Sequence, residues 1–474
     1  YSPRRVVLNN HSERLTKSTL LAYASPAIPI AAMGIPIAIY IPPFYAQEMG
    51  LGLSVVGLVF MLARIWDVIT DPVLGVMSDR FPTRWGRRRH WLVLSVPIML
   101  FSTWKLFMPD PEQVTAAYLM VWMLVMYIAW TLLSLTHQAW GAELSPDYNE
   151  RTRIQGTREV FLIIGAIVCL SLPSIIEQMN PEDLGMARVA SMGWMVILLL
   201  PITVLWAVLK VSEKKTVAID KISWKETFTV VKGNSPLQRL LLSEFTVGVS
   251  QGITASLFLF LAADVLKLGS WSSIILLLYF FSGIFYVPLF ALVSKKVGKH
   301  VSLAICASVY AVGINFLWFI PEGSVVLTSV IMVILGMNMG APGFLLRSML
   351  ADIVDEDLVK TQKQRTGLFF SLYNMIEKIG GAVAIGITYL ALDMMGFVPG
   401  GENTESAIMG FKILFVVPAM LLNFLIAYVI KGFPLDKARQ ERNRKILESR
   451  QIPKNKPQDE SLSGDSVQGN LNPN

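Results

Sequence analysis

The sequence has little charge for its length, and this absence excludes most classes of soluble protein. Charged residues make up 16% of the 474 residues, whereas soluble domains are usually about 25% charged. Hydrophobic residues make up 53% of the chain. A chain of this composition cannot cover its surface with polar groups, and it is typical of an integral membrane protein.

Cysteine and histidine are also scarce, which limits the chemistry that the chain could perform. The two cysteines, Cys169 and Cys306, lie far apart in apolar runs, so the sequence indicates no disulfide and no metal site. None of the four histidines forms a pair with the spacing of zinc ligands. We therefore expect no cofactor, and a membrane enzyme is the weakest interpretation of this sequence.

The positive charge is concentrated in alternate loops. The net charge is +7, and the basic segments are the N-terminal tail, 79–90, 151–153, 295–299 and 360–365. Because basic loops of membrane proteins lie in the cytoplasm, both termini are predicted to be cytoplasmic. The expected location is the plasma membrane, or the inner membrane of a bacterium. Since topology accounts for the positive charge, no nucleic acid partner is expected.

Twelve apolar runs are long enough to cross a bilayer as helices, which takes roughly 20 residues each. The predicted spans are 18–46, 53–79, 91–108, 114–144, 156–178, 190–212, 238–266, 271–294, 300–320, 324–352, 366–395 and 407–431. The first span holds five prolines, which should bend it. We predict an all-α membrane protein that crosses the lipid bilayer many times.

A polar segment in the middle of the chain divides the spans into two sets of six. It contains a capping box, Ser223 with Glu226 three residues later, so a short amphipathic helix is expected there. The sequences that follow Pro72 and Pro288 share charged, glycine and histidine positions, which supports duplicated halves. The predicted organisation is a cytoplasmic N-terminal tail (1–17), a six-helix half (18–212), a cytoplasmic linker (213–237), a second six-helix half (238–432) and a disordered cytoplasmic tail (433–474).

The segment RIWDVITDPVLGVMSDR, residues 64–80, places two carboxylates inside a predicted span. Asp67 and Asp71 are four residues apart and share one helix face. Arg64 lies one turn earlier and Thr70 lies beside them, but one arginine neutralises only one of two acids. Ionisable groups inside a membrane usually serve a function. Oxygen ligands of this kind suit Na⁺, and an acid pair can instead hold H⁺ because adjacent negative charges favour protonation. We predict a site for a coupling cation.

Other polar side chains fall inside the spans of both halves. One face of the fourth span carries Tyr127, Thr131, Ser134 and Gln138, and the tenth and eleventh spans carry Arg347, Tyr373, Asn374, Glu377 and Lys378. Arg347 could serve a substrate, or it could pair with Asp352 or extend to the cytoplasm. Glu244 lies deep in the seventh span, and the sequence identifies no partner for it.

Four segments resemble the glycoside–pentoside–hexuronide:cation symporters, the melibiose-permease family. They are ARIWDVITDPVLG (63–75), GAELSPDYNERTRIQGTREVF (141–161), LADIVDED (350–357) and GLFFSLYNMIEKIGG (367–381). The loop GVMSDRFPTRWGRRRHW (75–91) also resembles a signature of the major facilitator superfamily. The resemblance implies a major facilitator fold, with two six-helix halves and transport by alternating access. It implies a symporter of a small molecule and a cation, and not an enzyme.

Residue by residue, the resemblance assigns roles to particular positions. The cation ligands of the family fall on Asp67, Thr70, Asp71 and Thr131. Its basic sugar-site residues fall on Arg158 and Lys378. The melibiose carriers have acids where this chain has Ala31 and Ser134, and a tryptophan where it has Gly343. The galactoside-binding set is therefore broken, and that substrate is not carried over.

The predicted substrate site draws on both halves. Its members are Tyr127, Ser134, Gln138, Arg158, Arg347, Tyr373, Asn374 and Lys378. Their positive balance favours a glycoside with an acidic group, such as a uronide. The same branch of the superfamily includes lysolipid carriers, so a lipid-like amphiphile is the alternative, which a long apolar cleft beside the charges would favour. A receptor or scaffold would leave the two acids without a role.

A cytoplasmic gate is predicted from the basic loop. Its residues are Asp79, Arg80, Arg87 and Arg88. An aspartate among arginines at a helix end can join the two halves through charge-assisted hydrogen bonds. We expect this network to set the conformation of a monomeric carrier.

Overall fold

The computed structural model describes residues 14–81, 83–145, 148–179, 185–213, 230–363, 365–435 and 437–451, and within these ranges it is all-helical. Twelve segments of the described chain are long and apolar enough to cross a membrane. The predicted fold class and number of spans are confirmed. Large apolar side chains such as Ile202, Leu205 and Leu209 are exposed on the outer faces, where lipid tails would contact a membrane protein.

The first half begins with a span that is divided into short elements. The elements of this half are α1 (Lys17–Ala24), α2 (Ala27–Ile35), η1 (Pro36–Tyr40), α3 (Ile41–Gln47), α4 (Leu53–Arg80), α5 (Arg89–Phe107), η2 (Pro111–Gln113), α6 (Ala116–Glu143), α7 (Tyr148–Met179) and α8 (Gly185–Lys210). The divisions fall at Pro26 and Pro36, because proline lacks an N–H group and disturbs the preceding helical turn. The predicted bending of the first span is confirmed.

The second half follows the linker and ends with a helix outside the bundle. Its elements are α10 (Ser235–Phe260), η3 (Leu261–Val265), η4 (Gly269–Trp271), α11 (Ser272–Val297), α12 (Lys299–Gly313), η5 (Ile314–Phe319), α13 (Val325–Leu335), α14 (Met337–Thr361), α15 (Thr366–Met394), α16 (Glu405–Ile430) and α17 (Lys437–Gln451). A polar side chain caps the start of α10. Asn234 Oδ1 accepts a hydrogen bond from the backbone N of Leu237 at 3.0 Å.

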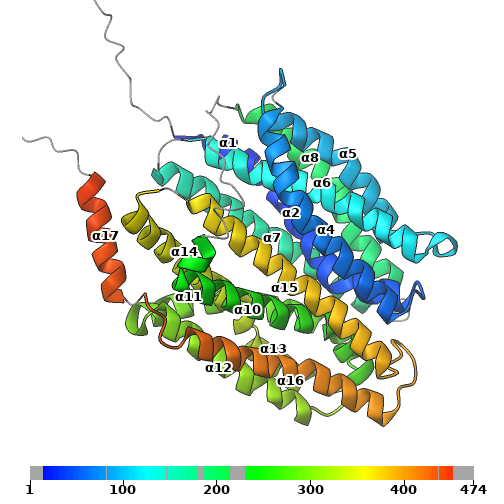
Figure 1. Cartoon of the computed structure of the whole chain (residues 1–474). Coiled ribbons are helices and arrows are strands. Elements are labelled where there is room, and N and C mark those ends of the chain that lie inside the picture. The colour runs from blue at the N-terminus through cyan, green and yellow to red at the C-terminus, as the bar shows by residue number, and fades with distance from the viewer. Residues whose placement is uncertain are drawn as a thin grey trace, which may run out of the picture.

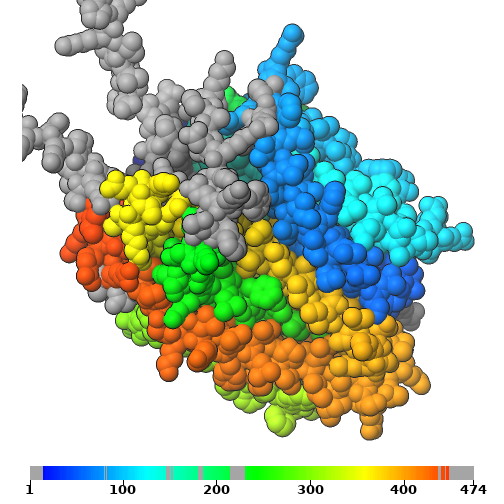
Figure 2. All heavy atoms as spheres, viewed as in Figure 1, coloured from blue at the N-terminus to red at the C-terminus, as the bar shows by residue number. Residues whose placement is uncertain are grey.

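The two halves lie side by side and meet along α4 and α15 (Figure 1). On the face shown in Figure 2, α15 lies between α4 of the first half and α16 of the second. Close approach is possible because Gly57 of α4 has no side chain: a Cβ atom there would lie 2.7 Å from the Cβ atom of Tyr389. This contact brings the acids of α4 opposite Lys378 of α15.

The C-terminal tail differs from the prediction, because α17 is helical within the segment predicted to be disordered. Arg439 Nη2 lies 2.6 Å from Glu356 Oε1 of α14, and Gln440 Nε2 donates to Asp352 Oδ1 of the same helix. Local composition indicates disorder in such a polar segment, but it carries no information about charged partners elsewhere in the fold. The predicted linker helix around Ser223 and Glu226 lies outside the described residues.

Candidate cation site and transport cavity

Asp67 and Asp71 of α4 converge with Thr131 of α6. The Thr131 hydroxyl lies 2.9 Å from Asp67 Oδ1 and 2.9 Å from Asp71 Oδ1, and its single proton can serve only one of them at a time. Asp67 is 1% exposed, so this charge is almost entirely removed from solvent. The Thr70 hydroxyl donates to the backbone O of Asp67 at 3.2 Å, so its predicted role as a cation ligand stays a prediction. Three of the four predicted cation ligands therefore meet at one point.

Positive side chains of the protein itself balance this acid pair of Asp67 and Asp71. Lys378 Nζ lies 2.5 Å from Asp71 Oδ2 and 2.9 Å from Asp67 Oδ2. Arg64 Nη1 lies 3.4 Å from Asp67 Oδ2, and its guanidinium carbon lies 5.5 Å from the ring centre of Tyr127. The lysine ammonium thus occupies the place where an external cation would meet the same oxygens.

A cavity of about 680 Å³ lies between the two halves. Its wall is mainly apolar and includes Ile35, Ile39, Leu170, Phe258, Phe280 and Met332. The polar side chains of its wall are those of Arg64, Gln251, Thr254, Tyr279 and Glu377. Because Arg64 both lines the cavity and pairs with Asp67, the cavity adjoins the acid pair.

The eight predicted substrate residues are all described, and none of them lines this cavity. Lys378 lies at the acid pair instead. Arg158 is buried, and its Nη1 lies 2.9 Å from Glu159 Oε1 on the same helix. Tyr127 is also buried, beneath Arg64. The positions of Lys378 and Tyr127 in the sequence did not show that their side chains contact α4.

The predicted substrate residues of α14 and α15 form a separate group. Arg347 Nη2 lies 3.6 Å from Glu377 Oε2, and its guanidinium carbon lies 5.8 Å from the ring centre of Tyr373. The alternative pairing with Asp352 is not formed, since Asp352 Oδ2 lies 2.6 Å from Lys299 Nζ. Of the remaining members of the set, Asn374 and Gln138 are exposed and Ser134 is partly buried. Glu377 connects this group to the cavity that it lines.

The halves are also joined at the end of the bundle opposite the termini. The carboxylate of Glu177, on α7, is fully buried. Its Oε1 accepts from Ser273 Oγ at 2.6 Å and lies 3.0 Å from Arg188 Nη1, and its Oε2 accepts from the backbone N of Ser273 at 3.0 Å. Tyr40 donates to Ser273 Oγ at 3.0 Å. Since Ser273 lies in the first turn of α11, the first half caps a helix of the second. We call Tyr40, Glu177 and Ser273 the far-end gate.

Sequence reasoning missed the far-end gate. Glu177 stands near the end of the fifth predicted span and Ser273 near the start of the eighth. Nothing in the sequence pairs them, because an acid at a span end ordinarily faces water. The available signal was an acid at the end of one span with Arg188 at the start of the next.

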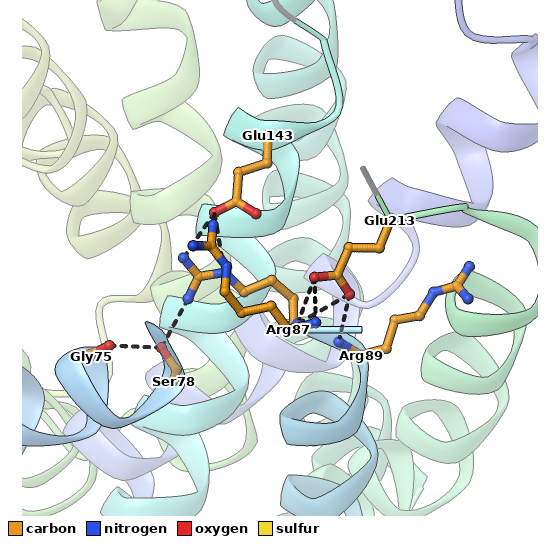
Figure 3. Close-up of polar contacts among 7 residues, drawn as sticks. Gly75, Ser78, Arg87, Arg89, Glu143 and Glu213 are labelled. Atoms are coloured by element: carbon orange, nitrogen blue, oxygen red, sulfur yellow. Dashed lines mark hydrogen bonds and ion pairs between the residues drawn. The ribbon is translucent and has the colours of Figure 1, made fainter. Parts of the chain in front are cut away.

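The basic loop after α4 is braced within the first half (Figure 3). Arg87 Nη2 and Arg88 Nη2 lie 2.6 Å and 2.8 Å from Glu143 Oε1 of α6. Glu213 accepts from the backbone N of Arg87 at 2.6 Å and from that of Arg88 at 2.9 Å. These contacts hold the loop against α6 and the end of α8, and the predicted connection between the halves stays a prediction. The side chains of Asp79 and Arg80 lie outside the described residues.

Residues 248–252 read GVSQG, which matches the G-x-S-x-G spacing of serine hydrolases. A nucleophilic serine of that type sits on a sharp turn between a strand and a helix. Ser250 instead lies in the middle of α10, where its hydroxyl accepts from Asn423 Nδ2 at 2.8 Å. The motif is therefore a helix-packing sequence in this fold.

Comparisons with known proteins agree with this architecture. A model of the family described as "MFS/sugar transport protein" matches residues 22–437. The chain is 23% identical to the sodium-dependent lysophosphatidylcholine symporter 1-B of Danio rerio, covering 94% of this chain and 92% of that protein. It is 25% identical to the glucuronide carrier protein homolog of Escherichia coli, covering 84% and 88%.

Among solved structures, the nucleoside transporter NupG matches with a TM-score of 0.63 at 12% identity, over 89% of this chain and 100% of that one. At this identity the likeness concerns the fold alone. It agrees with two packed six-helix halves.

Proposed function

Since the chain belongs to the MFS/sugar transport protein family, among the glycoside–pentoside–hexuronide symporters, we propose that it couples substrate uptake to a cation bound by Asp67, Asp71 and Thr131. The convergence of these three side chains carries the proposal. All three offer oxygen ligands inside a membrane span, where an unpaired charge is costly. Na⁺ is the favoured cation, because related symporters are sodium-dependent, and H⁺ is the alternative.

Lys378 would act in this mechanism as an internal competitor of the cation. Its ammonium neutralises the acid pair when no cation is bound, which removes the cost of two buried negative charges. An entering cation displaces the lysine, and release of the cation lets the lysine return. The empty carrier can therefore change conformation without an unpaired carboxylate in the membrane.

Replacing Lys378 by glutamine is expected to tighten Na⁺ binding while lowering uphill accumulation. Charged hydrogen bonds contribute about 1.5–3 kcal/mol each, so losing the competitor should improve the Na⁺ dissociation constant roughly tenfold or more. Calorimetric titration of purified protein with NaCl measures this change. The control is Lys378→Arg, which retains the charge. Unchanged or weaker Na⁺ binding in the glutamine variant would rule out the competitor role.

For the substrate, the apolar wall of the cavity favours an amphiphile with a polar head near Arg64 and Glu377. A free sugar presents hydroxyl groups on most of its surface, and burying them against aliphatic side chains without hydrogen bonds is unfavourable. A chain of methylene groups gains free energy from the same wall. The lysophosphatidylcholine symporters among the relatives agree with this substrate class.

An acidic glycoside is the second candidate, and Arg347 is the observation that favours it. Its side chain is 56% exposed, and its guanidinium lies beside the cavity-lining Glu377. A carboxylate on the substrate could replace Glu377 as its partner through charge-assisted hydrogen bonds. The glucuronide carrier homolog among the relatives is consistent with this candidate.

Substitution of Arg347 by glutamine should separate these two candidates. If the substrate carries a carboxylate that binds Arg347, its affinity should fall by roughly tenfold to a hundredfold, corresponding to about 1.5–3 kcal/mol for a charged hydrogen bond. A neutral analogue should lose much less. Equal losses for both ligands would exclude recognition of charge at this position.

Counterflow in proteoliposomes tests the function as a whole. Labelled lysophosphatidylcholine and a labelled glucuronide would be offered separately, with and without Na⁺. Na⁺-stimulated exchange of one ligand identifies the class, and no exchange of either would reject both candidates. The proposed carrier is a monomer with both ends of its chain in the cytoplasm.

A further inference from the structure

The second half contains a buried carboxyl group that the cation mechanism does not use. Glu244 of α10 is 3% exposed. In the described part of the chain, its Oε2 atom has no hydrogen-bond partner, and neither does the hydroxyl of the buried Tyr373. Buried acids are ordinarily paired with a base or with several donors, because an isolated carboxylate in a membrane interior is costly.

The groups around Glu244 do not supply a dedicated positive partner. Tyr373 and Glu377 face it from α15, and Arg347 faces it from α14. α16 also packs on α10, and there the neutral Asn423 donates to Ser250. One arginine therefore stands among two carboxyl groups, and it lies 3.6 Å from Glu377.

One arginine cannot neutralise both acids, so the charge balance favours a neutral form of one of them. Glu377 is 48% exposed and is paired with Arg347, so it can remain ionised. Glu244 is 3% exposed and shares Arg347 with Glu377, and ionising it would place a second negative charge next to Glu377. A proton on Glu244 removes that cost.

We propose that Glu244 is a proton-binding site of the second half, separate from the acid pair, and that its proton exchanges as Arg347 moves between Glu377 and Glu244. When Arg347 pairs with Glu377, Glu244 holds the proton. When a ligand in the cavity engages Glu377, Arg347 turns to Glu244, and the proton leaves. Because Glu377 lines the cavity, occupancy of the cavity controls this step.

Helix packing keeps these groups together. α10 and α15 are in close contact, since a Cβ atom on Gly248 would lie 3.1 Å from the backbone O of Glu377. A Cβ atom on Gly380 would lie 2.8 Å from the backbone O of Phe245, the neighbour of Glu244. These contacts hold α10 and α15 at a short separation, so Glu244 stays near Glu377 and Tyr373.

Infrared difference spectroscopy of the purified full-length protein tests this site without any transported substrate. The carbonyl stretch of a protonated carboxylic acid should appear in wild type at neutral pH, disappear as the pH is raised, and return on reversal. In Glu244→Gln this band should be lost. The matched control is Glu150→Gln: Glu150 is 5% exposed, but its Oε1 lies 2.9 Å from Arg153 Nη1, so it should contribute no such band.

Each outcome decides the proposal. Loss of a pH-responsive band in Glu244→Gln, with the band kept in Glu150→Gln, supports it. A band that persists in Glu244→Gln overturns the proposal. A Glu244-dependent band that does not respond to pH also overturns it, because the proton on Glu244 would then not exchange. If Glu244→Gln fails to fold, Glu244→Asp should retain the band at a shifted frequency, whereas an unshifted band would overturn the proposal. These results are independent of whether the acid pair binds Na⁺.

Discussion

Replacing Asp67 by asparagine is expected to abolish cation-driven accumulation of substrate while leaving a folded protein. Asp67 is 1% exposed and accepts from Thr131 while contacting Lys378 and Arg64. Asparagine retains the size of the side chain but removes its negative charge. Interactions with a charged group contribute about 1.5–3 kcal/mol each, so loss of this carboxylate should weaken Na⁺ binding roughly tenfold to a hundredfold.

The measurement is the ratio of internal to external substrate in proteoliposomes with an imposed Na⁺ gradient. Asp71→Asn should act in the same direction. Asp393→Asn is the control, because this acid of α15 is exposed and contacts Ser54 at the far end. Size-exclusion chromatography and thermal unfolding confirm that each variant is folded. Wild-type accumulation in Asp67→Asn and Asp71→Asn would remove the acid pair from the mechanism.

Opening of the far end should follow from replacing Glu177 by alanine. The carboxylate accepts two hydrogen bonds from Ser273 across the halves, at 2.6 Å and 3.0 Å. Hydrogen bonds to charged groups contribute about 1.5–3 kcal/mol each. Losing of order 3 kcal/mol would change the ratio of closed to open far ends by roughly a hundredfold. The carrier should then dwell with its cavity open at this end, and its turnover should slow.

Thiol accessibility in intact cells measures this shift. A cysteine at Ala38, which lines the cavity, would be introduced into a background without Cys169 and Cys306. A membrane-impermeant reagent should label it much faster when Glu177 is alanine. Glu322→Ala is the control, since this exposed acid pairs with Lys267 of its own half at 3.2 Å and does not join the two halves in that contact. If both variants label at the wild-type rate, Glu177 does not hold the far end closed.

Several features could be predicted because they depend on short stretches of sequence. The number of spans follows from the length of apolar runs, and the bends of the first span follow from Pro26 and Pro36. The shared face of Asp67 and Asp71 follows from their spacing on one helix. The docking of α17 could not be predicted in this way, since it depends on Glu356 and Asp352 of a distant helix.

Among the ionisable residues too, some features follow from the sequence, whereas their partners depend on how the helices pack. The sequence pattern alone marked Asp67 and Asp71 as exceptional, because a carboxylate in a membrane span is costly wherever the helix lies. It assigned Lys378 to the substrate, whereas the packing of α15 on α4 places the ammonium between the two acids. Adjacent residues of a helix point in different directions, so Glu377 faces Arg347 while Lys378 faces α4.

By itself, the sequence determined that this protein is a helical protein with twelve membrane spans and an acid pair in its second span. These properties are local, since the apolar length, the loop charge and the residue spacing each depend on one short segment of the chain. Only the tertiary structure decided which charged side chains pair with one another and which residues line the apolar cavity. The cavity wall, the far-end gate and the isolation of Glu244 all arise where helices from distant parts of the chain pack together, and that packing depends on the shapes of both surfaces.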